Sequence, residues 1–235
     1  MRIPIPRTSG VNEVLLTALA LSIAQWRRCH GRGDGSAVLV EVDFPAAKEL
    51  RESGLERTIL LHELKAGLNA YLRGRRGLRV RTLSDVIRWN EAHADEEMPY
   101  FRQEFFEKAQ ATRGLRSRAY LEARKTALRL SRAEGIDRVL RKNRIQALVA
   151  PSNAPAAALD VVDGEKHLGG STQPSAVAGY PIITVPAGTA FGLPLGLSFF
   201  AGSGSEGRLL GFAYAFEQET QARTTPEFVP TLVVP

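Results

Sequence analysis

Hydrophobic residues recur at spacings of three and four through much of residues 44–142, and this spacing predicts helices. The clearest stripe predicts a helix with one buried face, formed by Leu55, Ile59, Leu60, Leu64, Leu68, Tyr71 and Leu72. A second helix is predicted to begin at Thr82-Leu83-Ser84-Asp85, because Thr82 or Ser84 can cap its first turn. Pro99 either ends that helix or begins a third one, which carries Phe101, Phe105 and Phe106.

A further helix is predicted from about Arg118 to Lys142. Its apolar stripe consists of Tyr120, Ala123, Ala127, Leu130, Ile136, Val139 and Leu140. Gly135 lies within this stretch, where it either interrupts one helix or separates two. Residues 12–28 and 205–219 predict two more helices, one near each end of the chain.

Short runs of β-branched and apolar residues predict strands at residues 37–42, 145–151, 182–185 and 195–200. A Gly/Pro loop is expected between the last two strands, and a long loop is expected from Ser152 to Pro174. Residues 2–6 contain two prolines and are expected to be extended, and the tail from Arg223 is also expected to be extended. Helices and strands that alternate in this way predict the α/β class.

The composition is that of a folded globular protein, and the net charge is +6 over 235 residues. Basic residues are scattered among acidic ones without a recognition motif, so we do not expect nucleic-acid binding. Cys29 is the only cysteine, which favours a reducing compartment, and we expect a cytoplasmic protein. Val14 to Ala24 fits either a signal-peptide core or a buried helix, and the arginines that follow favour the helix. No apolar stretch reaches the roughly 20 residues that a membrane-spanning helix needs, so we expect no membrane association.

Candidate chemistry is sparse. The four histidines His30, His62, His93 and His167 lack metal-ligand spacing, so no metal or other cofactor is expected, and hydrogen-bonded or solvated roles are favoured for His62 and His93. Gly169-Gly170-Ser171-Thr172 combines small residues with hydroxyls in a predicted loop. A serine nucleophile there needs a base, for which Lys166 or His167 is nearest in sequence, but a tight turn is the favoured interpretation.

Three segments in the last third of the chain carry a resemblance: "ALVAPSNAPAA", "HLGGSTQPSAVAGYPIITVPAG" and "GLPLGLSFFAGSGSEGRLLGFAYAFEQET". In this order they resemble the C-terminal half of the amidase signature family, which are serine amidohydrolases. The resemblance implies the C-terminal portion of that fold, a mixed β-sheet covered by α-helices. It also implies a single partial domain over residues 1–235, divided into an entry region (1–43), a helical region (44–142), a sheet and pocket region (143–222) and a tail (223–235).

Amidases of this family use a Ser–Ser–Lys triad in and before a Gly/Ser-rich signature in their N-terminal half, and these 235 residues contain no such signature. We therefore expect no catalytic residues in this chain and no amide hydrolysis by the chain alone. The resemblance implies that Gly170, Ser171, Thr172 and Ser175 line the acyl pocket, with His167 and Leu168 near its entrance. A packed Gly/Ser turn against a sheet is the alternative for this loop.

Three functional hypotheses follow. The first is a truncated or split amidase that supplies fold and pocket elements. It would bind a small-molecule amide only when complemented by a catalytic half, with which it would associate, or it would form a homo-oligomer. The alternative is a non-catalytic ligand-binding or protein-interaction module derived from an amidase. A hydrolase that uses Ser171 or Ser175, with Lys166 or His167 as base, is the least favoured of the three.

Overall fold

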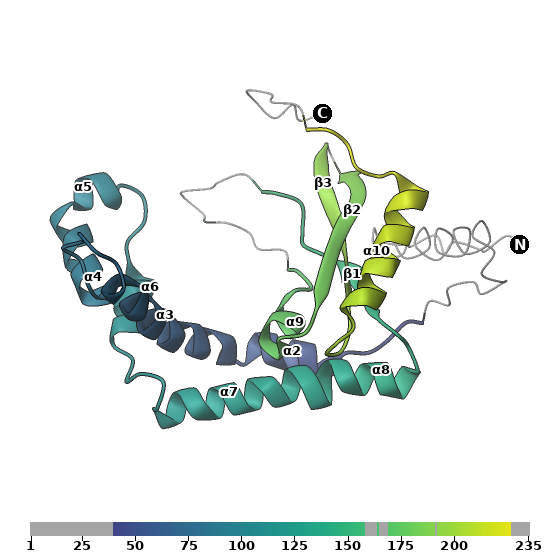
Figure 1. The fold of residues 1–235 in the computed structure, drawn as a ribbon, viewed down its shortest axis with the longest axis horizontal. Coiled ribbons are helices and arrows are strands. Elements are labelled where there is room, and N and C mark those ends of the chain that lie inside the picture. The colour runs from purple at the N-terminus through teal and green to yellow at the C-terminus, as the bar shows by residue number, and fades with distance from the viewer. Residues whose placement is uncertain (1–39, 158–163, 165–168, 191, 227–235) are drawn as a thin grey trace, which may run out of the picture. The chain divides into compact units, whose positions relative to one another are not determined.

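The computed structural model describes residues 40–157, 164, 169–190 and 192–226, and these fall into two compact units (Figure 1). The helical unit is Pro45–Ser131. The sheet unit consists of the described residues up to Phe44 and from Arg132 onward. The predicted helix of residues 12–28 and the extended residues 2–6 lie outside the described part of the chain.

The helical unit contains six helices among its residues: α2 (Pro45–Glu52), α3 (Leu55–Arg73), α4 (Leu83–Ala92), α5 (Ala94–Glu97), α6 (Glu104–Gln110) and α7 (Arg118–Ser131). The α3 helix packs against α6 and α7. Two polar residues of α3 make these contacts: Lys65 Nζ donates to the carbonyls of Gln110 and Thr112 at 2.5 and 2.9 Å, and His62 is buried against α7. Polar contacts of α3 therefore help to hold this unit together.

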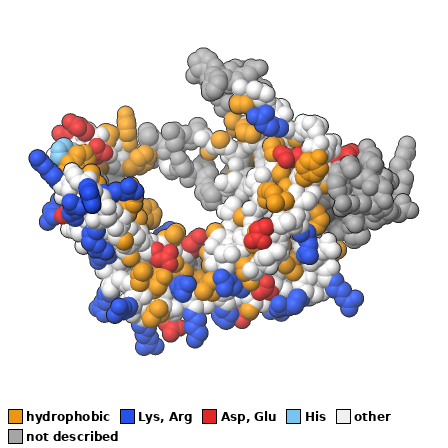
Figure 2. Space-filling view, viewed as in Figure 1, with side chains coloured by type: hydrophobic (Ala, Val, Ile, Leu, Met, Phe, Trp, Pro, Cys, Tyr) orange, Lys and Arg blue, Asp and Glu red, His pale blue; other side chains and the backbone are white. Residues whose placement is uncertain are grey.

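The buried face predicted for α3 is only partly correct. Leu72 is buried, but Leu60 and Tyr71 are 57% and 55% exposed. Polar His62 and Lys65 occupy part of the inner face instead, so hydrophobic spacing alone assigned the wrong face at these turns. Phe101 is also exposed, at 70%, and it precedes α6 rather than lying within it. Figure 2 shows hydrophobic side chains at the surface of the part of this unit that holds α4, α5 and α6.

The predicted start of α4 is confirmed. Thr82 Oγ1 accepts a hydrogen bond from the Asp85 backbone N–H at 3.2 Å, and the Asp85 carboxylate accepts one from the Thr82 N–H at 2.9 Å. This reciprocal pair is a capping box, which satisfies backbone donors that would otherwise lack a partner in the first turn. The Arg81 N–H donates to the same carboxylate at 3.0 Å, and it makes the largest contribution to holding the pKa of Asp85 below its ordinary value, followed by Thr82.

The helix predicted from Arg118 to Lys142 is interrupted at Gly135, which was one of the two alternatives expected there. After α7, a π-helical turn, η1 (Arg132–Ile136), contains Gly135 with non-helical angles of φ −98° and ψ −116°. The α8 helix (Asp137–Asn143) follows. The predicted stripe is buried at most of its positions on both sides of the break, namely at Tyr120, Ala123, Ala127, Leu130, Ile136 and Val139.

The sheet unit is built on three described strands: β1 (Leu148–Pro151), β2 (Ile182–Ala190) and β3 (Leu193–Phe200). They form an antiparallel sheet in the order β1-β3-β2. The helices α9 (Gln173–Ala178) and α10 (Glu206–Thr220) complete the unit, and α10 confirms the predicted last helix. Helices and sheet together confirm the α/β class.

Two strand predictions need correction. The Gly/Pro loop expected between residues 185 and 195 is instead the continuation of β2 and β3, with an irregularity in the register between Pro186 and Gly188. Such an irregularity accommodates a proline, which cannot donate to a ladder. Residues 40–42 of the predicted strand 37–42 form no strand, and residues 37–39 lie outside the described part.

The two faces of the sheet have separate cores. Val185, Leu197 and Phe199 pack against Leu209 and Phe216 of α10 on one face. On the other face, Phe200 and Leu148 join a cluster that also includes residues of η1, α8 and α9, namely Ile136, Val139 and Ala178. Within the described residues, no helix is long and apolar enough to cross a membrane.

Candidate functional site

The segment that follows β1 connects the sheet to the predicted pocket loop. The Ser152 N–H donates to the Gly196 carbonyl of β3 at 2.8 Å, and the Ser152 carbonyl accepts from the Ser171 N–H at 3.2 Å. Asn153 and Gly170 form an antiparallel bridge, and the Ala154 N–H donates to the Gly169 carbonyl at 3.2 Å. The pocket loop is therefore hydrogen-bonded to the chain directly beyond the end of β1.

Position 170 has little room for a side chain, because it lies close to Asn153 and to the Ser152 backbone. A Cβ atom on Gly170 would lie 2.6 Å from Asn153 Oδ1 and 3.0 Å from the Ser152 carbonyl oxygen. The preceding Gly169 has a φ of +96°, which L side chains rarely adopt. Both positions therefore favour glycine, Gly170 because space is limited and Gly169 because of its backbone conformation.

Two of the predicted pocket hydroxyls are buried without a hydrogen-bond partner among the described residues. These are Ser171 Oγ and Ser175 Oγ, and Ser175 is fully buried. Thr172 differs, because it is exposed. A buried hydroxyl without a partner is uncommon in folded proteins and indicates a group that another molecule or segment can satisfy. Lys166, His167 and Leu168 lie outside the described residues.

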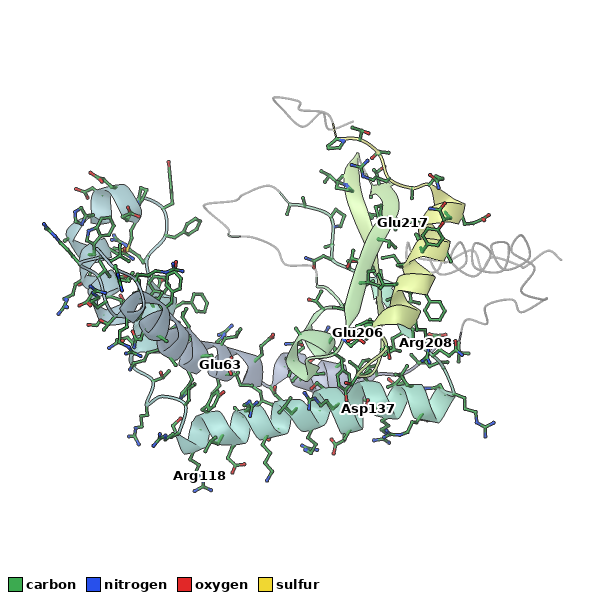
Figure 3. The ribbon with its side chains drawn as sticks, in the orientation of Figure 1. Glu63, Arg118, Asp137, Glu206, Arg208 and Glu217 are labelled. Atoms are coloured by element: carbon green, nitrogen blue, oxygen red, sulfur yellow. The ribbon has the colours of Figure 1, made fainter. Side chains whose placement is uncertain are left out.

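The α9 helix places Ser175 in its first turns, and the residues after α9 anchor it. Gly179 ends α9 in the left-handed conformation with a φ of +67°, and the Tyr180 N–H donates to the Ser175 carbonyl at 3.0 Å. The Tyr180 hydroxyl donates to Asp137 of α8 at 3.1 Å. Figure 3 labels Asp137, the first residue of α8. Burial raises the pKa of Tyr180, and its hydrogen bond to Asp137 adds to this shift.

Three hydroxyls meet on the face of the sheet beside this loop. Ser152 Oγ donates to Thr184 Oγ1 at 3.2 Å, and Ser198 Oγ donates to Ser152 Oγ at 2.7 Å. Thr184 Oγ1 and Ser198 Oγ are 2.9 Å apart, and their residues are directly paired in the β2–β3 ladder. We call this group the hydroxyl ring.

Metal binding has no support in the described part of the chain, where no group of three metal-ligating side chains occurs. The prediction that His62 and His93 are hydrogen-bonded is confirmed. His62 Nδ1 bonds the Thr58 carbonyl at 2.8 Å and its Nε2 lies 3.1 Å from Ser117 Oγ, whereas His93 Nδ1 bonds the Trp89 carbonyl at 2.8 Å.

Comparisons with known proteins identify the fold. No family model matches the chain. A probable amidase of Arabidopsis thaliana is 35% identical over 207 residues, which are 84% of this chain and 36% of that protein. The structure of the native peptide amidase from Stenotrophomonas maltophilia is 40% identical, with a TM-score of 0.76, and the match covers 91% of this chain and 41% of that one. The chain belongs to the amidase signature family.

The match to the family extends over most of this chain but over a minor part of its relatives. The chain spans 36% of the length of the plant relative and 41% of that of the bacterial peptide amidase. A shorter segment of 53 residues is 40% identical to one glutamyl-tRNA(Gln) amidotransferase subunit from Thermoanaerobacter pseudethanolicus, and it covers 23% of this chain and 11% of that protein. These matches confirm the family predicted from the three quoted segments.

Chemically, the two unpartnered hydroxyls of this loop, Ser171 Oγ and Ser175 Oγ, are groups that can donate and accept hydrogen bonds. A serine becomes a nucleophile when a base accepts its proton, and neither Ser171 Oγ nor Ser175 Oγ bonds to one within the described residues. The assignment of Gly170, Ser171, Thr172 and Ser175 to a substrate pocket stays a prediction. The structure places all four on one continuous loop and helix start, hydrogen-bonded through Ser171 to the end of β1.

The hydroxyl ring is the part of the site that the sequence did not reveal. Ser152, Thr184 and Ser198 come from three separate segments, and none stands in a motif with the others. Only the pairing of β1 and β2 with β3 brings them together. The available signal was weak: the hydroxyl residues Thr184 and Ser198 lie within the otherwise apolar runs of β2 and β3, and each interrupts the apolar pattern there.

Proposed function

We propose that this chain is the C-terminal, pocket-forming part of a hydrolase that acts on carbon–nitrogen amide bonds, and that the nucleophile and base come from residues outside these 235. The observation that carries the proposal is the match to the peptide amidase, which covers 91% of this chain but 41% of that enzyme. The rest of that enzyme has no counterpart here. A complete active site therefore needs a second polypeptide segment.

Substrate enclosure is the role that the residues in this chain can perform. The loop of Gly170, Ser171 and Thr172 presents backbone and hydroxyl groups beside the sheet, and Ser175 adds a buried hydroxyl. Because a relative with a solved structure is a peptide amidase, we propose a peptide amide as the substrate class. Hydrogen bonds from such a loop would bind the amide beside a serine of the catalytic part.

The chain alone should be inactive. Removal of the nucleophile and base of a serine hydrolase lowers kcat on the order of 10⁶-fold, and the remainder comes from binding and oxyanion stabilisation. We propose that the chain regains activity by association with a catalytic half. The proposal includes no role for nucleic acid and no resident cofactor.

The decisive experiment measures ammonia release from a peptide amide by the purified 235-residue chain, alone and co-expressed with a catalytic part. A suitable catalytic part is the portion of the Stenotrophomonas maltophilia peptide amidase that this chain does not match. We expect turnover only when both are present, with the catalytic part alone as the control. Turnover by the 235-residue chain alone would overturn the proposal.

A ligand-binding module is the competing outcome of the same experiment. If the combination produces no turnover while the chain alone binds a peptide amide saturably in calorimetry, the non-catalytic alternative is correct. The two unpartnered hydroxyls, Ser171 Oγ and Ser175 Oγ, are the feature that favours this alternative. Absence of both turnover and binding would reject both functions.

We also propose that the protein works in a reducing compartment such as the cytoplasm. Its single cysteine, Cys29, cannot form a disulfide within the chain. Expression of a tagged chain followed by fractionation of the cells tests this, and recovery outside the cytoplasmic fraction would contradict it.

A further inference from the structure

The hydroxyl ring is closed by three hydrogen bonds. Each hydroxyl has one proton: Ser152 donates its proton to Thr184, and Ser198 donates its proton to Ser152. The contact between Thr184 and Ser198 at 2.9 Å must then use the proton of Thr184. All three protons are used within the ring, and each hydroxyl both donates and accepts once.

The ring extends from the surface of the sheet to its interior. Thr184 is exposed on β2, whereas Ser198 is fully buried on β3. Space around the ring is limited, because a Cβ atom on Gly196 would lie 2.8 Å from Ser152 Oγ and 2.9 Å from Thr184 Cγ2. The side chain of Ser152 is therefore held by two hydrogen bonds and by close packing against the β3 backbone.

Ser152 transmits this restraint to the predicted pocket loop. Its N–H is bonded to the Gly196 carbonyl at 2.8 Å, and its carbonyl accepts from the Ser171 N–H at 3.2 Å. Residue 153, next in the chain, forms the bridge to Gly170. A single residue thus connects the ring on one side to the pocket loop on the other.

We propose that Ser152, Thr184 and Ser198 are positioning residues, which fix the loop of Gly169 to Ser171 at the distance from the sheet that a bound amide substrate requires. This inference rests on the proposed function, because it assigns the loop to the substrate pocket. The three positioning residues lie outside the loop: Ser152 directly follows β1, Thr184 is in β2 and Ser198 is in β3. No proton of the ring reaches the substrate, so the ring acts through Ser152 and Ser171.

The test uses a matched pair of substitutions at Thr184, in the full chain. Thr184→Val keeps the shape of the side chain and removes the hydroxyl, whereas Thr184→Ser keeps the hydroxyl and removes the methyl group. Thr184 is exposed, so neither change should prevent folding. Ser198→Ala opens the ring from its buried side and provides a second, independent variant.

The first readout is amide hydrogen exchange, which does not depend on activity. In Thr184→Val and Ser198→Ala, exchange at the Ser171 and Ala154 N–H groups should accelerate about fivefold, the typical effect of losing one net hydrogen bond. Exchange in α10 should stay unchanged, and Thr184→Ser should restore the wild-type rates. Unchanged exchange at Ser171, equal acceleration in α10, or no rescue by Thr184→Ser would each overturn the proposal.

The second readout is kinetic, in the chain combined with a catalytic part. Thr184→Val should raise KM about fivefold with kcat nearly unchanged, because the loop would bind substrate and transition state alike less well. A fall in kcat at constant KM would contradict a positioning role. If the combination shows no turnover at all, the proposed function fails, but the exchange experiment still decides whether the ring positions the loop.

Discussion

Arg132 Nε donates a hydrogen bond to the backbone carbonyl of Ala178 at 2.7 Å, which ties the π-helical turn to the last residue of α9. The same guanidinium lies 5.5 Å from the ring centroid of Tyr180. Carbonyls in the last turn of a helix have no partner within that helix, and a cation there also interacts favourably with the helix dipole. Arg132 therefore fixes one end of the helix whose other end carries the predicted pocket residues.

Loss of this arginine should loosen α9. We expect Arg132→Ala to lower the free energy of unfolding by about 1–2 kcal/mol, the range for a hydrogen bond from a charged group that is partly exposed to solvent. Arg138→Ala is the matched control, because Arg138 is an exposed arginine of α8. Urea denaturation followed by circular dichroism measures both variants, and equal effects would show that the Ala178 contact contributes nothing.

Two glycines of the site should not tolerate a methyl group. At Gly196 and Gly170 an added Cβ would come within 2.8 and 2.6 Å of side-chain oxygens. We expect Gly196→Ala and Gly170→Ala each to cost about 1–3 kcal/mol of stability, as overpacking does. Gly211 provides the contrast, since it is within α10 with nothing near its Cβ position, so Gly211→Ala should stabilise by about 0.5–1 kcal/mol. Thermal denaturation of the three variants checks both signs.

The stability of the sheet unit should fall at alkaline pH through Tyr180. Its pKa is raised above the ordinary value of 10.0, first by burial and then by the hydrogen bond to Asp137. Because the folded pKa exceeds the unfolded one, this contribution is complete below pH 10 and is lost as the pH rises through the folded pKa.

Tyr180→Phe removes this titration, so its stability should fall less steeply than that of the wild type above pH 10. Denaturation midpoints across this range, together with phenolate absorbance, measure the difference. Asp137→Asn keeps the size of the acceptor but removes its charge, so the folded pKa of Tyr180 should be raised less. The alkaline fall in stability should then be smaller and should end at lower pH than in the wild type. Identical pH profiles for the wild type and Tyr180→Phe would contradict the prediction.

Local signals in the sequence predicted much of the fold. Thr82 and Asp85 form the expected cap, because a capping box depends on residues three apart in one turn. Gly135 interrupts the helix, which was one of the two alternatives expected there, since the backbone preference of glycine acts locally. The family resemblance then added what local patterns could not, namely the fold to which these helices and strands belong.

The errors came from features that depend on tertiary contacts. Leu60 was assigned to a buried face because of its spacing. The inner side of α3 instead carries His62, which contacts Ser117, and Lys65, which bonds the Gln110 carbonyl. Pro186 indicated a loop, but the sheet accommodates it beside a register shift. The hydroxyl ring was invisible for the same reason, because strand register cannot be deduced from single segments.

Removing the hydroxyl of Ser175 and removing that of Ser198 should change the free energy of unfolding in different directions. Ser175 Oγ is buried without a partner among the described residues, so Ser175→Ala removes a group that costs free energy to bury and should leave stability unchanged or raise it by up to about 1 kcal/mol. Ser198 is equally buried but bonded twice, so Ser198→Ala should cost about 1–2 kcal/mol. Urea denaturation of the two alanine variants compares them directly.

The same two alanine variants also distinguish a role in substrate binding from a role in folding. If the substrate or the catalytic part supplies the missing partner of Ser175, Ser175→Ala should weaken amide binding by the combined enzyme even though the chain itself is as stable as before. A fluorescence titration with a peptide amide measures that loss. Equal destabilisation by Ser175→Ala and Ser198→Ala would mean instead that Ser175 Oγ is already satisfied within the chain, and it would remove Ser175 from the pocket.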